Sequence, residues 1–114
     1  MKRLNLAIVA AVALALPAVS LAETWSNAPL IDKMCSAKMK DTPDKHPTTC
    51  AIKCAASGYG VLKADGAFVP FDKAGNEKAL AALKATKKAD HLRVNVTGEM
   101  KDGVIAVESL ALNE

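Results

Sequence analysis

The C-terminal end of the chain carries the pattern that most restricts its fold. Residues 91–101 read HLRVNVTGEMK, in which Leu92, Val94 and Val96 alternate with polar residues. Strict alternation puts successive side chains on opposite faces, so it predicts a half-buried β-strand rather than a helix. The residues KDG at 101–103 then supply a turn, and VIAVESLAL at 104–112 supplies a second strand. A chain that ends in such a hairpin needs a β-sheet to receive it.

The returning strand contains a change of phase. Ile105 and Val107 share one parity, whereas Leu110 and Leu112 share the other. An extra residue near Glu108–Ser109 would point both pairs to the same face, and we therefore predict a β-bulge there.

Three further strands are predicted upstream. Trp25–Ile31 is rich in apolar residues, but Asn27 and Pro29 predict that it is irregular or lies at a sheet edge. Residues 59–71 predict a second hairpin, in which Asp65–Gly66 supplies the positive φ values of a tight turn.

Two helices are predicted in the connections between strands. The segment AGNEKALAALKATKK at 74–88 has Ala79, Leu80 and Leu83 at helical spacing, and we expect Leu80 and Leu83 to pack its 76–87 part across the sheet. A shorter helix, N-capped by Thr48 or Thr49, is expected to run to about residue 57 and to stop at Gly58. The residues between Asp41 and Pro47 are predicted to be loop.

The order of elements predicts a fold of mainly β structure with two helices, in the α+β class. Five strands with a helix between the third and the fourth is the layout of an OB-type barrel. The cysteine-bearing helix would then be an insertion after the first strand. An α+β sandwich built from the same five strands is the alternative.

The N-terminus predicts export. Lys2 and Arg3 precede an apolar run from Leu6 to Leu16, and small residues stand at positions 20 and 22. This is the pattern of a signal peptide cleaved after Ala22, and the run is too short to cross about 30 Å of hydrocarbon. We therefore predict a signal peptide at 1–22, a single domain at 23–114, no membrane span after cleavage and a periplasmic location.

The charge of the exported part excludes one class of partner. The whole chain has 15 basic and 12 acidic residues, and removal of Lys2 and Arg3 leaves 13 − 12 = +1. The remaining basic residues form no stripe of the kind that binds nucleic acid. A protein or a small ligand is the expected partner.

Three segments resemble a group of small exported bacterial proteins. They read IDKMCSAKM at 31–39, CAIKCAASGYGVLKADGAFVPF at 50–71 and LRVNVTGEMKDGVIAVESL at 92–110. The shared pattern runs D-x-M-C-x-x-K-H, then C-x-x-x-C before a hairpin, then a strand with V-T-G. The resemblance implies an OB-like fold and export, but the group has no assigned activity. Met39 stands where the pattern has His.

All three cysteines fall in one stretch, MCSAKMKDTPDKHPTTCAIKC at 34–54. One reading is a metal site built from Cys35, Cys50 and Cys54 with Met39 or His46 as a further ligand. Thiolate, thioether and imidazole ligands suit copper as Cu(I), and zinc through Cys and His.

A disulfide is the other reading of the same stretch, and the one we rank first from the sequence. It would join Cys35 to Cys54 or to Cys50, with Cys54 favoured because Cys50 opens the helix and should be more exposed. Closing a loop of this length stabilises a domain by about 3 kcal/mol in the chain-entropy model. Nothing apolar between Met39 and Cys50 holds the segment to a core, so we expect a covalent closure.

Catalysis finds little support in the sequence. The C-x3-C spacing departs from the C-x-x-C of thiol redox enzymes, and no Ser/His/Asp set, phosphate loop or carboxylate pair has a recognisable spacing. We therefore expect a non-enzymatic, disulfide-stapled periplasmic module that binds a protein or a small ligand. A soft-metal binding protein is the alternative, and a thiol redox protein ranks third.

Overall fold

The computed structural model describes residues 22–114. The predicted signal peptide therefore lies outside the described residues, apart from Ala22. The described part contains five strands and three α-helices: β1 (Glu23–Asp32), α1 (Lys33–Met39), α2 (Thr48–Lys53), β2 (Tyr59–Leu62), β3 (Phe68–Pro70), α3 (Lys73–Ala85), β4 (Arg93–Lys101) and β5 (Val104–Leu112). Short 3₁₀ turns occupy Pro43–Lys45 and Ala55–Ser57.

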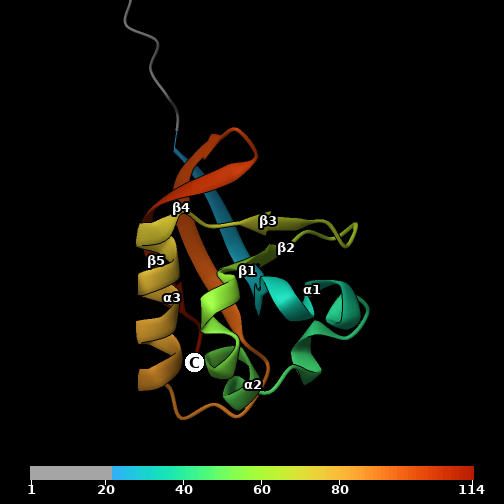
Figure 1. Ribbon diagram of the computed structural model, residues 1–114. Coiled ribbons are helices and arrows are strands. Elements are labelled where there is room, and N and C mark those ends of the chain that lie inside the picture. Colours follow the sequence, from blue (N-terminus) through green and yellow to red (C-terminus); the bar gives the residue numbers. More distant parts are fainter. Residues whose placement is uncertain (1–21) are drawn as a thin grey trace, which may run out of the picture.

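The strands form one open sheet in the order β3-β2-β1-β4-β5, and all four neighbouring pairs are antiparallel. The prediction of a mainly β, α+β fold with five strands is confirmed. In Figure 1, α3 runs along one side of the sheet, whereas α1 and α2 gather near the end of β1. The helix α1 is an addition to the two helices that the sequence predicted.

The first strand lies at the centre of the sheet, so the prediction of an edge position is wrong. Its irregularity is confirmed: the register with β4 shifts between Trp25 and Ala28, and Asn27 has φ +49°. Pro29 is compatible with a central strand, because the backbone N–H groups of successive residues point to opposite edges of that strand. The N–H of Leu30 faces β4 through Leu92, so the Pro29 nitrogen faces the β2 edge, where pairing begins only at Leu30.

The C-terminal hairpin has the predicted phase change. Thr97 pairs with Ser109 and Gly98 pairs with Val107, which leaves Glu108 as the extra residue of a bulge. Both apolar pairs consequently face inward. Ile105 and Val107 are buried, and Leu110 and Leu112 pack partly buried against the same core.

The helix α3 lies against this hairpin. Asp72 caps its N-terminus by accepting a hydrogen bond from the Gly75 N–H (2.9 Å). Ala79 and Leu83 are fully buried, whereas Leu80 is only partly buried against the core. The helix ends at Ala85, before the predicted limit, and Thr86 is already extended (ψ 150°).

The segment between β1 and β2 is more helical than predicted. The residue before α2 is Pro47, so the predicted cap by Thr48 or Thr49 is wrong: the Thr48 hydroxyl instead donates to the Lys88 carbonyl oxygen (2.7 Å). The predicted stop is confirmed, because Gly58 has φ +84° and follows the 3₁₀ turn that extends α2.

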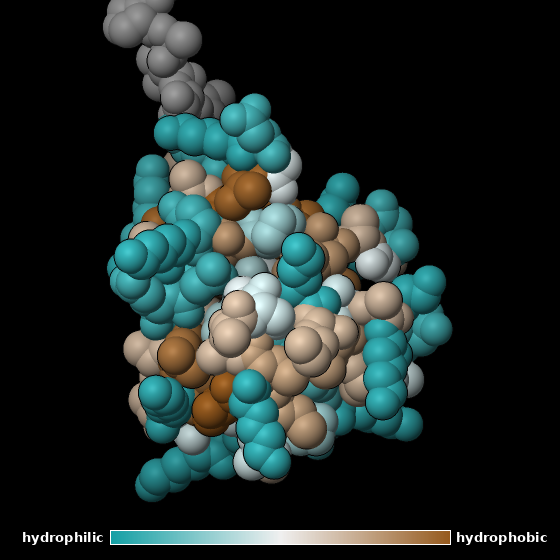
Figure 2. Space-filling view, viewed as in Figure 1, coloured by the Kyte–Doolittle hydropathy of each residue, from teal (hydrophilic) through white to brown (hydrophobic). Residues whose placement is uncertain are grey.

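Strongly apolar residues appear only in small separate groups on the face drawn in Figure 2. Hydrophilic residues lie around the margin of this face, and residues of intermediate or weakly apolar character fill much of its middle. Among residues 22–114, no helix is long and apolar enough to cross a membrane.

Candidate functional site

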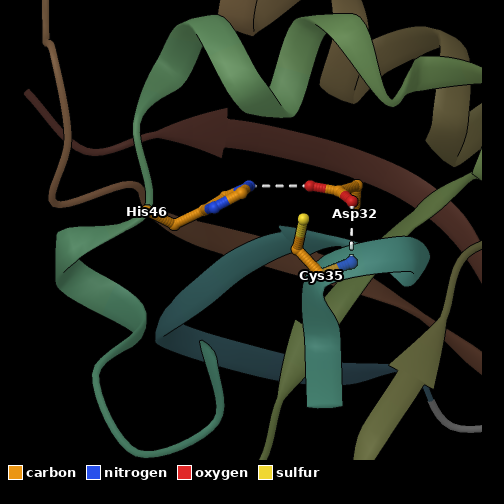
Figure 3. A group of neighbouring side chains, drawn as sticks. All are labelled: Asp32, Cys35 and His46. Carbon is orange, nitrogen blue, oxygen red and sulfur yellow. Dashed lines mark hydrogen bonds and ion pairs between the residues drawn. The ribbon is translucent and has the colours of Figure 1, made fainter. Parts of the chain in front are cut away.

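A buried carboxylate organises the candidate site. Asp32 is the last residue of β1 and the N-cap of α1, and it is fully buried (0% exposed). Its Oδ2 accepts the Cys35 N–H at 3.0 Å, and its Oδ1 accepts a hydrogen bond from His46 Nε2 at 2.7 Å (Figure 3). Both oxygens are thus satisfied, which is the condition for keeping a carboxylate inside a fold.

His46 reaches Asp32 from the other end of the connecting loop. It closes the 3₁₀ turn Pro43–Lys45, where its N–H donates to the Pro43 carbonyl oxygen (3.2 Å), and it is 2% exposed. A carboxylate only accepts hydrogen bonds, so the Nε2 atom carries the shared proton. The structure thus brings together two residues that lie fourteen positions apart in the chain.

Cys35 completes a group of three possible ligands. Asp32, Cys35 and His46 each contribute one ligand atom, and these three atoms lie within 4.8 Å of one another. Figure 3 shows the Cys35 sulfur pointing toward the Asp32–His46 pair. Tetrahedral zinc with nitrogen and sulfur ligands needs roughly 3.5 Å between those ligand atoms. A small side-chain rotation would therefore let the three atoms share one ion.

The Cys35 thiol is held in its protonated form. Burial is the main cause that raises its pKa to about 11, followed by the Asp32 carboxylate and the neighbouring Cys54 thiol. A nucleophilic cysteine needs the opposite shift, because the thiolate is the reactive form. The surroundings of Cys35 therefore disfavour catalysis by this thiol, whereas a bound cation would reverse the preference.

Two more sulfur atoms lie beside this group. Cys54 follows α2, is partly buried and lies near enough to affect Cys35. Its Sγ–H donates to the thioether sulfur of Met34 at 3.9 Å, and Met34 is 72% exposed. The sulfur atoms of Cys35, Cys54 and Met34 consequently lead from the buried pair to the surface.

The structure does not gather all the residues that the sequence placed in a metal site. Cys35 and His46 come together, but Cys50 is exposed and lies outside the group of three. Met39 ends α1, one turn beyond Cys35, and has no hydrogen bond to its sulfur among the described residues. Asp32 and Met34 were absent from the predicted set. The signal for Asp32 is the spacing D-x-x-C at the start of a helix, which is the spacing of an N-cap.

The predicted disulfide is not formed in this structure. Cys35, Cys50 and Cys54 are all free thiols. The prediction assumed that nothing else could hold the loop between Met39 and Cys50, and this premise is wrong. Asp44 accepts two hydrogen bonds from Arg93 (2.9 Å each), and its carbonyl oxygen accepts the N–H of His91 (2.9 Å).

A separate groove lies beside the bulged part of β1. It has a volume of about 500 Å³ and opens between this strand, the end of α1 and the turn between β2 and β3. Trp25 and Leu62 contribute apolar surface, and the charged residues that line it are Lys40, Lys63 and Arg93. Among the described residues of its lining, none is acidic.

Comparisons of the sequence and fold with protein-family models, with curated proteins and with solved structures found no match.

Proposed function

We propose that the protein binds a soft or borderline metal ion, copper or zinc, at Asp32, Cys35 and His46. The observation that carries this proposal is the convergence of three different ligand types, from the end of β1, from α1 and from the following loop, within 4.8 Å. The sequence ranked a disulfide-stapled binding module first. The convergence of Cys35 with His46 and Asp32 supports the metal reading more.

The ligand types favour some metals over others. Calcium and magnesium prefer sets made of oxygen atoms, whereas one thiolate, one imidazole and one carboxylate suit Zn(II) or copper. Binding would release the Cys35 thiol proton to water. His46 would bind as a neutral imidazole, either through Nδ1 while its Nε2–H stays hydrogen-bonded to Asp32, or through Nε2 after that proton has moved to Nδ1. Asp32 would orient His46 in the first case and could itself be a ligand in the second.

Metal titration of the purified, reduced protein tests this proposal. We expect about one equivalent of Zn(II) to bind in competition with a fluorescent chelator, and Cys35→Ser or His46→Ala to weaken binding about tenfold or more. Cys50→Ser is the matched control, because this thiol is exposed and outside the group. If Cys35→Ser and His46→Ala bound zinc and copper as tightly as the wild type does, the group would be purely structural.

We also propose that the five-stranded sheet closes into an OB-like barrel. An isolated parallel bridge between Phe71 and Ile105, next to a hydrogen bond from the Asp72 N–H to the Ile105 carbonyl oxygen (2.9 Å), supports it. The bridge brings the end of β3 to β5, and α3 lies between β3 and β4 in the chain, as in OB folds. An experimental structure with a continuous ladder between β3 and β5 would establish closure.

Export to the periplasm remains the proposed location. Its support is the charged, apolar and small-residue pattern of residues 1–22. Mass analysis of the protein recovered from the periplasm should find Glu23 as its first residue. A mature chain that still contains Leu6–Leu16 would contradict this proposal.

The groove supports a second function, the binding of a small aromatic anion. Lys40 and Lys63 beside a half-buried tryptophan, with no acidic lining residue, offer charge pairing and a stacking surface, whereas Arg93 is already paired with Asp44. Trp25 is the single tryptophan of the chain, so its fluorescence reports on the groove alone. We expect 1-naphthoate to quench it and the uncharged 1-naphthamide not to do so.

Lysine variants make that test specific. Lys40→Glu and Lys63→Glu should abolish the quenching by 1-naphthoate, whereas Lys78→Glu on the exposed face of α3 should leave it unchanged. Quenching that is equal for the two naphthalene compounds, or unchanged by both groove variants, would exclude an anion site.

A further inference from the structure

The candidate metal site continues outward as a row of sulfur atoms. Cys35 belongs to the group with Asp32 and His46, Cys54 lies next to it, and the Cys54 thiol contacts the Met34 thioether at 3.9 Å. These residues come from the first turn of α1 and from the end of α2. The close approach of the two helices to the end of β1 therefore assembles three sulfur atoms.

Exposure rises along this row. Asp32 and His46 are 0% and 2% exposed, Cys35 and Cys54 are partly buried, and Met34 is 72% exposed. The other exposed large hydrophobic side chain among the described residues is that of Met100, at 42%. The more exposed of the two thus lies against Cys54, beside the site.

Ligand chemistry changes along the same row. The inner members are a carboxylate and an imidazole, which bind Zn(II) well, whereas the outer members are two thiols and a thioether. A thioether is a soft ligand that binds Cu(I) and contributes little to Zn(II) sites. The outermost ligand therefore discriminates between the two metals that the inner group would accept.

We propose that Cys35, Cys54 and Met34 form a Cu(I) site in which Met34 is the surface ligand that takes up and releases the ion. This inference rests on the proposed metal function and names its metal. Cu(I) replaces the thiol protons of Cys35 and Cys54, which leave to water, while Met34 donates a lone pair. No electron is transferred, so no oxidant or reductant is required.

Parallel Cu(I) and Zn(II) titrations separate this inference from the proposed function. Both use the reduced protein under anaerobic conditions, with bicinchoninate as the competitor for Cu(I) and a fluorescent chelator for Zn(II). We expect Met34→Leu to weaken Cu(I) binding about tenfold or more and to leave Zn(II) binding unchanged. Met100→Leu and Met39→Leu are matched controls that should change neither affinity.

The two thiols give a second matched pair. Cys54→Ser should weaken Cu(I) binding more than Met34→Leu does, because a thiolate is the stronger ligand, and Cys50→Ser should have no effect. Wild-type Cu(I) affinity in both Met34→Leu and Cys54→Ser would overturn the inference. The proposed function would still stand in that case if Cys35→Ser and His46→Ala had lost zinc.

An NMR measurement on the unsubstituted protein shows whether Met34 itself contacts the ion, independently of any change in folding that the substitutions cause. Silver(I), a redox-inert analogue of Cu(I), should shift the ε-methyl NMR signal of Met34 and leave that of Met100 in place. An unshifted Met34 signal at saturating Ag(I) would also overturn the inference.

Discussion

Two regions of this protein are stabilised by different physical means. In the half formed by α3, β4 and β5, apolar side chains such as Leu83, Val94 and Ile105 are buried against one another. In the segment 33–57, which carries the cysteines, only His46, Thr48 and Ala51 are buried. Hydrogen bonds with Asp32, with Arg93 and with the loop before β4 hold this segment instead.

The difference bears on function. Buried apolar contacts are insensitive to pH and to ions, whereas a network of carboxylate, imidazole and thiol groups responds to both. The polar region is thus the one in which a ligand could exchange protons with the protein. The following variants test whether the two regions are separable in this way.

The largest effect is expected in the apolar half. Leu83→Asp would place an unpaired carboxylate at a site that is 1% exposed, which costs several kcal/mol against a total stability of a similar size. We expect the protein to be unfolded, with loss of its near-UV circular dichroism. A folded Leu83→Asp protein would show that α3 does not close the core.

The next largest effect is expected at the polar centre. Asp32→Ala removes the cap of α1 and the partner of His46, and we expect a loss of about 2–4 kcal/mol in urea unfolding. Asp32→Asn keeps an oxygen that can accept the Cys35 N–H, so it should lose less. In Asp32→Ala, amide hydrogen exchange should speed up more in residues 33–57 than in β4, relative to the wild type. Uniformly faster exchange would contradict separable regions.

Tyr59 links the two regions, and its loss should have a moderate effect. Its hydroxyl donates to the Ala51 carbonyl oxygen (2.7 Å), and burial, ahead of the charges of Asp32 and Cys54, raises its pKa to about 12. We expect Tyr59→Phe to cost about 1 kcal/mol, since the ring stays in place while the carbonyl oxygen loses its donor. A cost near zero would mean that another donor, such as water, reaches this carbonyl oxygen.

The smallest effect is expected from the surface ion pair, and it depends on pH. Hydrogen bonds from Arg93 hold the pKa of Asp44 below its ordinary value of 3.8. A carboxyl group with a lowered pKa in the folded state stabilises the protein above the ordinary pKa, and this stability is lost as the pH falls through the lowered value. Asp44→Asn should therefore cost up to about 1 kcal/mol at pH 7, because the pair is partly exposed.

Urea unfolding at several pH values measures this contribution. The difference between the wild type and Asp44→Asn should shrink as the pH falls below about 4 and should vanish once Asp44 is protonated in both states. A difference that persists at low pH would mean that the amide disturbs the loop for reasons other than charge.

The same two regions differ in how far they could be predicted. The C-terminal hairpin was predicted to the level of its bulge, because the parity of Ile105, Val107, Leu110 and Leu112 is local information. The central position of β1 was not predicted. Pro29 favours an edge strand, and only the pairing of β1 with β4 and β2 shows how a central strand accommodates it. The three-membered site was predicted in part, through Cys35 and His46.

The rest of the site depends on contacts that the sequence does not display. Asp32 reads as an ordinary helix cap, and its bond to His46 exists only because the loop returns to the end of β1. The expected difference between Cys50 and Cys54 is confirmed, since Cys50 at the start of α2 is exposed and Cys54 is partly buried. The predicted metal site nevertheless included Cys50, because a spacing of four places two side chains on one helix face.

The central position of β1 has a consequence for the order in which the chain folds. This strand is made first, and yet its partner along Glu23–Pro29 is β4, which ends at Lys101. A chain that has emerged only as far as α3 has one short partner strand for β1 and no cover for the other edge. Contacts between such distant residues form slowly. The sheet edge of β1 therefore stays open until the last hairpin arrives, and the hydrogen bonds that fix Asp44 and Thr48 to residues 88–91 come late in the chain as well.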